Sequence, residues 1–123
     1  MSEKPVAERL QVKKDRLLAV IGATPELDDW VGASDKRAGP SDADVVILFA
    51  RDNASLRAEL EGTMGKLQGT AILWVAYPKL SSKMAGDLNR DLIRSIVPDY
   101  GLDTISQIAV DNDWSALRLK RAI

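Results

Sequence analysis

Three short, largely continuous apolar runs constrain the fold of this chain more than any other feature. They are Leu17–Ile21 (LLAVI), Asp44–Ala50 (DVVILFA) and Ala71–Ala76 (AILWVA), and Gly22 and Pro78 close the first and the last. Runs of this length, bounded by turn residues, are typical of strands that are buried on both faces. Because such strands occur mainly in parallel sheets covered by helices, the runs predict an α/β fold with three central strands.

The segments between and after these runs have helical patterns. After the first run, Pro25 can open a short helix at its first position. After the second run, Asp52 or Asn53 can cap a helix. A third helix is predicted over Leu88–Val97, ending at Pro98. The apolar faces are Leu27, Trp30 and Val31 in the first helix, and Leu56, Leu60, Met64 and Leu67 in the second.

Two strand-like runs, Leu102–Val110 and Trp114–Leu119, follow the third helix. Asp111-Asn112-Asp113 separates them, and a short polar link between two such runs predicts an antiparallel hairpin. Residues 32–42 are polar and are interpreted as a loop that could contain a degraded strand. The predicted fold class is therefore α/β, a three-layer, Rossmann-like, mostly parallel sheet with a C-terminal antiparallel hairpin strand.

The bulk composition limits the chemistry and the setting of the protein. Its 123 residues predict one domain over residues 1–123, with residues 1–15 as an N-terminal extension or short helix. No cysteine or histidine is present, which excludes disulfides, thiol nucleophiles, imidazole bases and zinc sites of the Cys/His type. A net charge of −1 predicts no general attraction to nucleic acid or to a membrane surface. Without a signal-like or membrane-spanning run, we expect a cytoplasmic protein.

Polar and charged side chains that could bind a ligand are densest between the third strand and the third helix. In an α/β fold this loop lies at the carboxyl end of a strand and at a helix N-terminus, where ligands usually bind. The candidate ligand-binding residues are Tyr77, Lys79, Ser81, Ser82, Lys83, Asp87, Asn89, Arg90 and Asp91. Their hydroxyl and ammonium donors favour a phosphate or a carboxylate. No catalytic motif is present among them, and no catalytic residue is assigned.

The same loop also has a purely structural interpretation. Ser81–Lys83 could belong to a solvated loop in which a serine or Asp87 caps the third helix. Asn89 could cap that helix or bond to the Tyr77–Lys79 backbone. The charged residues of the third helix could form an ordinary solvated face held by weak ion pairs.

The tryptophans and the acidic turn favour structural roles. Trp30, Trp74 and Trp114 are interpreted as core or sheet-covering residues, because no basic stripe accompanies them as nucleic-acid binding would require. Asp111-Asn112-Asp113 is interpreted as a hairpin turn, because it lacks the glycine and the other oxygen ligands of a calcium loop. No metal site is predicted.

Several short motifs on this order of elements resemble a known family. They are YPK at 77–79, SSK at 81–83, DLNRD at 87–91, VD at 110–111 and WSALR at 114–118. A parallel sheet finished by an antiparallel hairpin strand resembles the class I methyltransferase fold. The motifs resemble a family of small bacterial domains of unknown function that look like cut-down methyltransferases. The resemblance covers most of Leu10–Arg121 and implies the fold, but it implies no activity.

The chain departs from a working methyltransferase at two places. The turn Ile21–Pro25 has one glycine, whereas a glycine-rich turn would let the backbone approach the cofactor. No convincing second strand ends in an acidic residue that could bind the ribose hydroxyls. The acidic residues available nearby are Glu26, Asp28, Asp29 and Asp35. We therefore predict no cofactor and no useful binding of S-adenosylmethionine.

The function predicted from the sequence is binding without catalysis, to a protein partner or to a small anionic ligand. One alternative is an enzyme that acts on a phosphorylated or carboxylated small molecule through the Lys79–Asp91 loop. That enzyme would need Lys83, Asp87 and Arg90 to converge on a pocket. A second alternative is a structural homodimer subunit that pairs through the closing strand or a helix pair.

Overall fold

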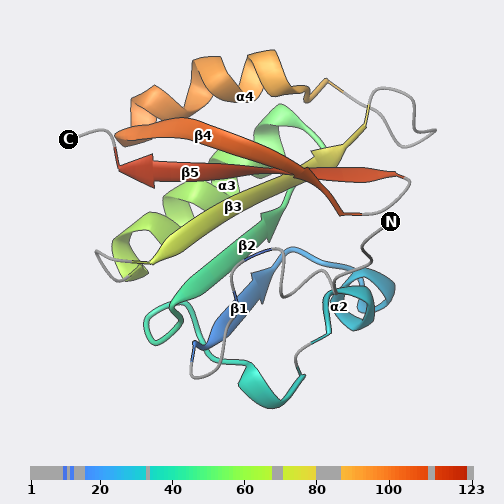
Figure 1. Ribbon diagram of the computed structural model, residues 1–123. Helices are drawn as coiled ribbons and strands as arrows, with labels where there is room; N and C mark the ends of the chain where they lie inside the picture. Colours follow the sequence, from blue (N-terminus) through green and yellow to red (C-terminus); the bar gives the residue numbers. More distant parts are fainter. Residues whose placement is uncertain are drawn as a thin grey trace.

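The computed structural model describes residues 10, 12, 16–32, 34–67, 71–79, 87–110 and 113–121. The strands in this part of the chain are β1 (Leu18–Ile21), β2 (Val45–Phe49), β3 (Ile72–Pro78), β4 (Leu102–Ala109) and β5 (Trp114–Arg121) (Figure 1). The α-helices are α2 (Pro25–Val31), α3 (Asn53–Thr63) and α4 (Arg90–Ile96). Short 3₁₀ helices lie at Ser34–Lys36, Met64–Lys66 and Val97–Tyr100. The three predicted core strands and both strands of the predicted hairpin are therefore present.

The strands form one mixed sheet in the order β1-β2-β3-β5-β4. β1, β2 and β3 are parallel, whereas β5 is antiparallel to both β3 and β4. The two parallel connections pass through α2 and α3, as parallel pairing requires. The predicted Rossmann-like α/β fold, with parallel N-terminal strands and an antiparallel closing hairpin, is confirmed.

The polar stretch at residues 32–42 contains the remnant of a further strand. Arg37 forms one isolated parallel bridge with Leu18, and the Ala38 N–H donates to the Leu18 carbonyl at 2.9 Å. The chain then turns at Gly39, whose carbonyl accepts the N–H groups of residues 42 and 43, each at 3.0 Å. The remnant pairs with the first residue of β1 and turns away before it reaches the carboxyl end of that strand.

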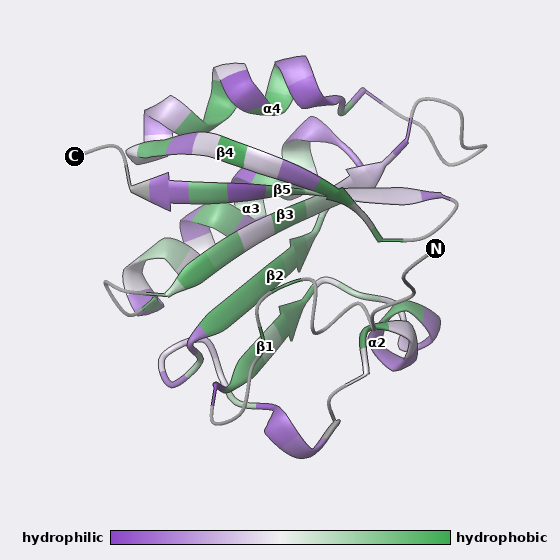
Figure 2. Cartoon of the chain, in the orientation of Figure 1, coloured by the Kyte–Doolittle hydropathy of each residue, from purple (hydrophilic) through white to green (hydrophobic). Residues whose placement is uncertain are grey.

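Helices cover both faces of the sheet (Figure 1). α3 and α4 pack on one face, and α2 packs on the other face together with Leu10 and Val12. Side chains alternate between the two faces of the sheet along β5, because Trp114 joins the apolar cluster under α2 and Leu117 joins the cluster under α3 and α4. In Figure 2 β1 and β2 are almost uniformly hydrophobic and β3 becomes paler towards its carboxyl end, whereas β4 and β5 alternate. The hairpin is therefore the more polar half of the sheet.

Side-chain oxygens cap each of the α-helices α2, α3 and α4. Thr24 accepts the Leu27 N–H at 3.3 Å, Asp52 accepts the Ser55 N–H at 2.8 Å, and Asn89 accepts the Leu92 N–H at 2.9 Å. Asn89 is thus the cap of α4, and the alternative prediction that Asp87 caps this helix is wrong. The Asp87 carboxylate instead accepts the Asn53 N–H at 2.8 Å, at the beginning of α3.

Two of the three tryptophans lie in the core as predicted, but the third does not. Trp74 and Trp114 are 2% and 3% exposed, whereas Trp30 is 54% exposed. Positions 27 and 31 of α2 lie one turn apart and share its buried face, and position 30 is rotated by about 100° from position 31. The indole N–H of Trp30 donates to the Val110 carbonyl at 3.0 Å, which fixes the ring beside the hairpin.

Candidate functional site

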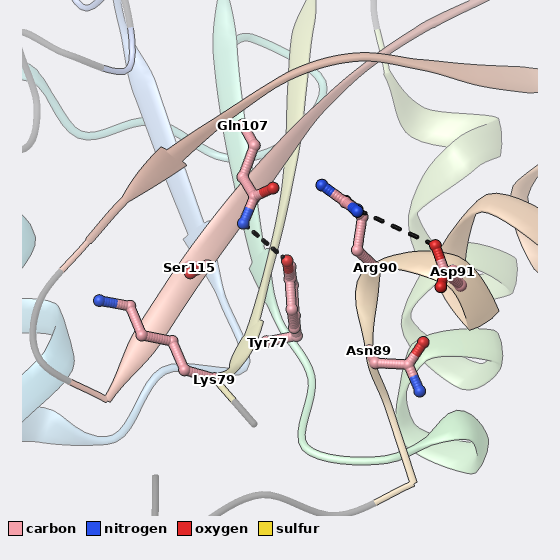
Figure 3. A pocket seen from close by; sticks show the side chains of 7 residues that line it. All are labelled: Tyr77, Lys79, Asn89, Arg90, Asp91, Gln107 and Ser115. Atoms are coloured by element: carbon pink, nitrogen blue, oxygen red, sulfur yellow. Dashed lines mark hydrogen bonds and ion pairs between the residues drawn. The ribbon is translucent and has the colours of Figure 1, made fainter. Parts of the chain in front are cut away.

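A cavity of about 590 Å³ lies at the carboxyl end of β3, between that strand, α4 and the β4–β5 hairpin. We call it the β3 cavity. Its lining residues are Tyr77, Lys79, Asn89, Arg90, Asp91, Gln107 and Ser115 (Figure 3). The volume falls in the range of about 300–1,000 Å³ that is usual for small-molecule sites.

Three strands and one helix position these side chains. Tyr77 is near the end of β3, and Ser115 of β5 lies directly opposite it in the antiparallel ladder. Lys79 follows β3, and its N–H donates to the Asp113 carbonyl at 2.8 Å, which holds its backbone against the start of β5. Gln107 comes from β4, and the cap and first turn of α4 supply the remaining residues. The site is therefore built mainly on rigid elements of the fold.

Tyr77 is the buried polar centre of the β3 cavity. Its side chain is 4% exposed, and the Gln107 Nε2 donates to its hydroxyl oxygen at 3.0 Å (Figure 3). Burial raises the pKa of the Tyr77 phenol above its usual value of 10.0, while the charge of Arg90 and the hydrogen bonds of Ser115 and Gln107 oppose that rise. The phenol therefore remains protonated at neutral pH and can donate a hydrogen bond.

The charged residues of the β3 cavity are two cations and one carboxylate. Lys79 and Arg90 lie on either side of the Tyr77 ring in the view of Figure 3. Arg90 Nε is 3.9 Å from Asp91 Oδ1, and the two side chains are 55% and 84% exposed. An ion pair this long and this exposed contributes little to stability. Within the described residues, Lys79 forms no ion pair. Both cations can therefore approach a ligand at little cost.

The structure brings most of the described candidate residues together. Five of them line the β3 cavity, namely Tyr77, Lys79, Asn89, Arg90 and Asp91. Asp87 does not, because its carboxylate bonds to the first turn of α3. Ser81, Ser82 and Lys83 lie outside the described residues.

Gln107 and Ser115 were not predicted, although a signal for Ser115 exists in the sequence. Residues 115, 117 and 119 share one face of β5, and the serine is the polar member of that otherwise apolar set. A buried hydroxyl on an apolar face needs a polar neighbour, and Tyr77 is that neighbour.

A family model described as "Protein of unknown function (DUF3052)" matches residues 8–122, which is almost the whole chain. The chain belongs to the DUF3052 family. This match confirms the resemblance to a family of domains of unknown function that the motifs indicated. A search of the curated proteins gave no match.

Solved structures similar to this DUF3052 protein are methyltransferases at low sequence identity. A SAM-dependent methyltransferase from Aquifex aeolicus has a TM-score of 0.61 and 11% identity over 93% of this chain and 86% of its own. A ribosomal protein L11 methylase from Lactobacillus delbrueckii subsp. bulgaricus has a TM-score of 0.60 and 12% identity, over 96% of this chain and 75% of its own. The tRNA methyltransferase TrmK of B. subtilis has a TM-score of 0.56 and 13% identity over 94% of this chain, which spans only 63% of its length. At these identities the likeness establishes a methyltransferase-like fold and nothing further.

The turn after β1 does not fit S-adenosylmethionine, the cofactor that this fold implies. Gly22 has a φ of +78°, and a Cβ there would lie 2.5 Å from the Phe49 carbonyl oxygen and 2.7 Å from Glu59 Oε2. The glycine is therefore needed for the close approach of this turn to β2 and α3. The next residues do not continue as a glycine-rich turn, because the Thr24 side chain caps α2 and Pro25 has no N–H.

In this fold, the acidic residue that binds the ribose hydroxyls stands at the carboxyl end of the strand after β1. The described residues form only a remnant of that strand. The remnant strand turns away before the carboxyl end of β1, and it carries Arg37. The Arg37 guanidinium lies 2.6 Å from Asp28 Oδ1 and donates to the Gly32 carbonyl at 2.8 Å. Asp28 thus holds the remnant strand against α2 through its ion pair with Arg37. Neither of the two features that bind the cofactor in this fold is formed by the described residues.

The described residues form neither a metal-binding cluster nor a membrane-spanning helix. Among them, no group of three or more acidic side chains is arranged to hold a metal ion. None of the helices formed by these residues has the length and apolar content needed to span a membrane.

Proposed function

We propose that this protein binds a small anionic ligand in the β3 cavity and acts by binding, without catalysis. The observation that carries the proposal is that Lys79 and Arg90 both line one cavity, in which Asp91 is the only carboxylate among the lining residues that the structure describes. Two cations and one carboxylate leave a local charge of +1. Ammonium and guanidinium groups form strong, charge-assisted hydrogen bonds with carboxylate and phosphate oxygens.

The buried wall of the cavity supports the same ligand class. Gln107 donates to the Tyr77 oxygen, and the hydroxyl of Ser115 also bonds to it. Because the phenol remains protonated, its own O–H can be directed to an acceptor oxygen of a ligand. The cavity thus presents two charged donors at its rim and one neutral donor at its base, and a small carboxylate or phosphate ester can use all three.

Binding without catalysis is supported by the groups that the cavity contains. The chain has no histidine or cysteine, and Asp91 is 84% exposed beside Arg90, so its carboxylate is well solvated. The enzyme alternative required Asp87 to converge with Arg90, but Asp87 bonds to the Asn53 N–H of α3 instead. The described residues therefore supply recognition groups more clearly than an acid–base pair.

An NMR titration of the full chain with phosphate, sulfate and succinate tests the proposal. We expect amide shifts to concentrate at residues 77–79, 89–91, 107 and 115. Lys79→Ala and Arg90→Ala should each weaken binding by roughly tenfold, since a charge-assisted hydrogen bond contributes about 1.5–3 kcal/mol. Arg94→Ala is the matched control, because Arg94 is an exposed cation of α4 that does not line the cavity.

Three results would contradict this assignment. Shifts that fall elsewhere on the protein would move the site, and equal losses in all three variants would indicate a general charge effect. The absence of saturable shifts would leave the protein-partner or homodimer function, and a doubled mass in solution would favour the homodimer.

A further inference from the structure

A second cavity, of about 290 Å³, lies on the face of the sheet that α2 covers. We call it the tryptophan cavity. Its lining includes Glu26, Leu27, Trp30, Arg51, Asp113 and Trp114. It shares no lining residue with the β3 cavity, so the two are separate sites that can be tested independently.

Two indole rings of the tryptophan cavity are held in fixed positions. Trp30 is 54% exposed, and its N–H donates to the Val110 carbonyl at 3.0 Å, so the ring stays at the rim. Trp114 is 3% exposed and meets Phe49 edge to face, with ring centroids 5.3 Å apart at an angle of 71°. A site whose aromatic walls are already ordered loses little conformational entropy when a ligand binds.

The charge of the tryptophan cavity is opposite to that of the β3 cavity. Among the lining residues that the structure describes, Glu26 and Asp113 carry carboxylates and Arg51 carries a guanidinium, so the formal charge of this lining is −1. The faces of indole rings attract cations through the negative side of their quadrupole. Aromatic walls and a surplus of carboxylate are the two features that recognise ammonium groups together.

We propose that the tryptophan cavity binds a small organic cation of the ammonium class, with the cationic head against the half-exposed ring of Trp30 and near Glu26. Arg51 is the one group that opposes this ligand. It also lines a neighbouring hollow on the α3 side together with Glu59. The guanidinium therefore has a carboxylate towards which it can turn when a cation enters.

The test compares choline with its neutral isostere, in which a quaternary carbon replaces the nitrogen. Both are titrated into the full chain at constant ionic strength, with calorimetry and tryptophan fluorescence as readouts. We expect choline to bind roughly tenfold more tightly than the isostere, as a cation–π site requires. Trp30→Ala and Glu26→Gln should weaken choline binding, whereas Arg51→Gln should strengthen it because it removes the like charge.

The control variant is Arg94→Ala, which removes an exposed cation that lines neither cavity and should leave choline binding unchanged. Trp30→Phe keeps an aromatic face if Trp30→Ala fails to fold, and it should retain part of the affinity. Equal binding of the isostere would overturn the proposal by reducing the cavity to an apolar hollow. So would a flat titration with millimolar choline, or a loss of choline binding in Arg51→Gln as large as that in Glu26→Gln.

Discussion

At the scale of single residues, Tyr77 connects the fold to the candidate site. It belongs to the apolar cluster under α3 and α4, yet its hydroxyl faces polar partners on β4 and β5. A buried hydroxyl that is satisfied in this way stabilises one arrangement of the hairpin against β3. The Tyr77 ring packs in the apolar core, and its hydroxyl oxygen bonds to Gln107 and Ser115 at the base of the β3 cavity.

The ionisation of Tyr77 gives a direct test of this environment. Tyr77 and Tyr100 are the two tyrosines of the chain, so in a Tyr100→Phe variant the phenolate absorbance reports Tyr77 alone. We expect a midpoint above the usual value of about 10, because burial disfavours the phenolate. Arg90→Ala in the same background should raise the midpoint further, because the charge of Arg90 favours the phenolate.

The same pKa has a consequence for stability. The folded-state pKa is raised, so the stabilisation is fully present below the unfolded value of about 10 and is lost as the pH rises through the folded pKa. Denaturant unfolding above pH 10 should therefore show a steeper loss of stability in the Tyr100→Phe variant than in Tyr77→Phe. A Tyr77 midpoint at or below 10 would contradict both expectations.

At the scale of elements, the C-terminal hairpin is an integral part of the sheet. β5 lies between β3 and β4 in the sheet order, so it is an interior strand although it comes last in the chain. Its first residue, Trp114, pairs with Pro78 of β3 and contacts the ring of Phe49 at the end of β2. Without β5, both the edge strand β4 and one wall of the β3 cavity would lose their support.

We predict that Trp114→Ala lowers the free energy of unfolding by about 3–5 kcal/mol, the usual cost of removing a buried tryptophan. Denaturant unfolding measures it, and Trp30→Ala is the matched control because it deletes the same side chain from a half-exposed position. The loss in the control should be clearly smaller. If the two variants unfold at the same denaturant concentration, or if a chain ending at Asp111 still unfolds cooperatively, the hairpin is not part of the folded core.

The elements that could be predicted from the sequence are those governed by local pattern. Continuous apolar runs gave the three parallel strands within one or two residues, and the acidic turn gave the hairpin. The helix caps were less certain, because Asp87 and Asn89 are chemically equivalent as caps. Only the position of α3, whose Asn53 N–H takes the Asp87 carboxylate, decides between them. Local pattern does not encode such long-range contacts.

The candidate site could be predicted only in part for the same reason. The loop after β3 was found because strand ends collect ligand groups, and Lys79 and Arg90 both line the cavity there. Gln107 and the acidic surroundings of Trp30 depend on how the hairpin and α2 pack, which the sequence pattern does not specify. Trp30 itself was interpreted as a core or sheet-covering residue, because its spacing from Leu27 is that of a buried helix face. In the structure it is rotated by about 100° from the buried position 31 and is 54% exposed.

At the scale of the whole molecule, the protein has a methyltransferase-like sheet from which the usual cofactor-binding edge is largely missing. A single bridge at Arg37 stands where a further parallel strand would extend the sheet beyond β1. The β3 cavity lies at the end of β3 and the tryptophan cavity lies against α2, while a further hollow lined by Gly22, Phe49 and Glu59 lies at the ends of β1 and β2. The sheet and its crossovers are therefore retained, while the residues that could bind ligands are arranged around different parts of the carboxyl edge.

This arrangement leads to a prediction for the intact protein. We expect millimolar S-adenosylmethionine to leave its melting temperature unchanged, because Gly22 packs against the Phe49 carbonyl and no acidic strand end follows β1. A ligand present at 100 times its Kd stabilises a fold by about 2.7 kcal/mol, which a thermal scan detects easily. A SAM-dependent methyltransferase of the same fold, scanned in parallel, must show that rise. A dose-dependent rise in the DUF3052 protein, confirmed by calorimetry, would mean that the edge beyond β1 rearranges to admit the cofactor.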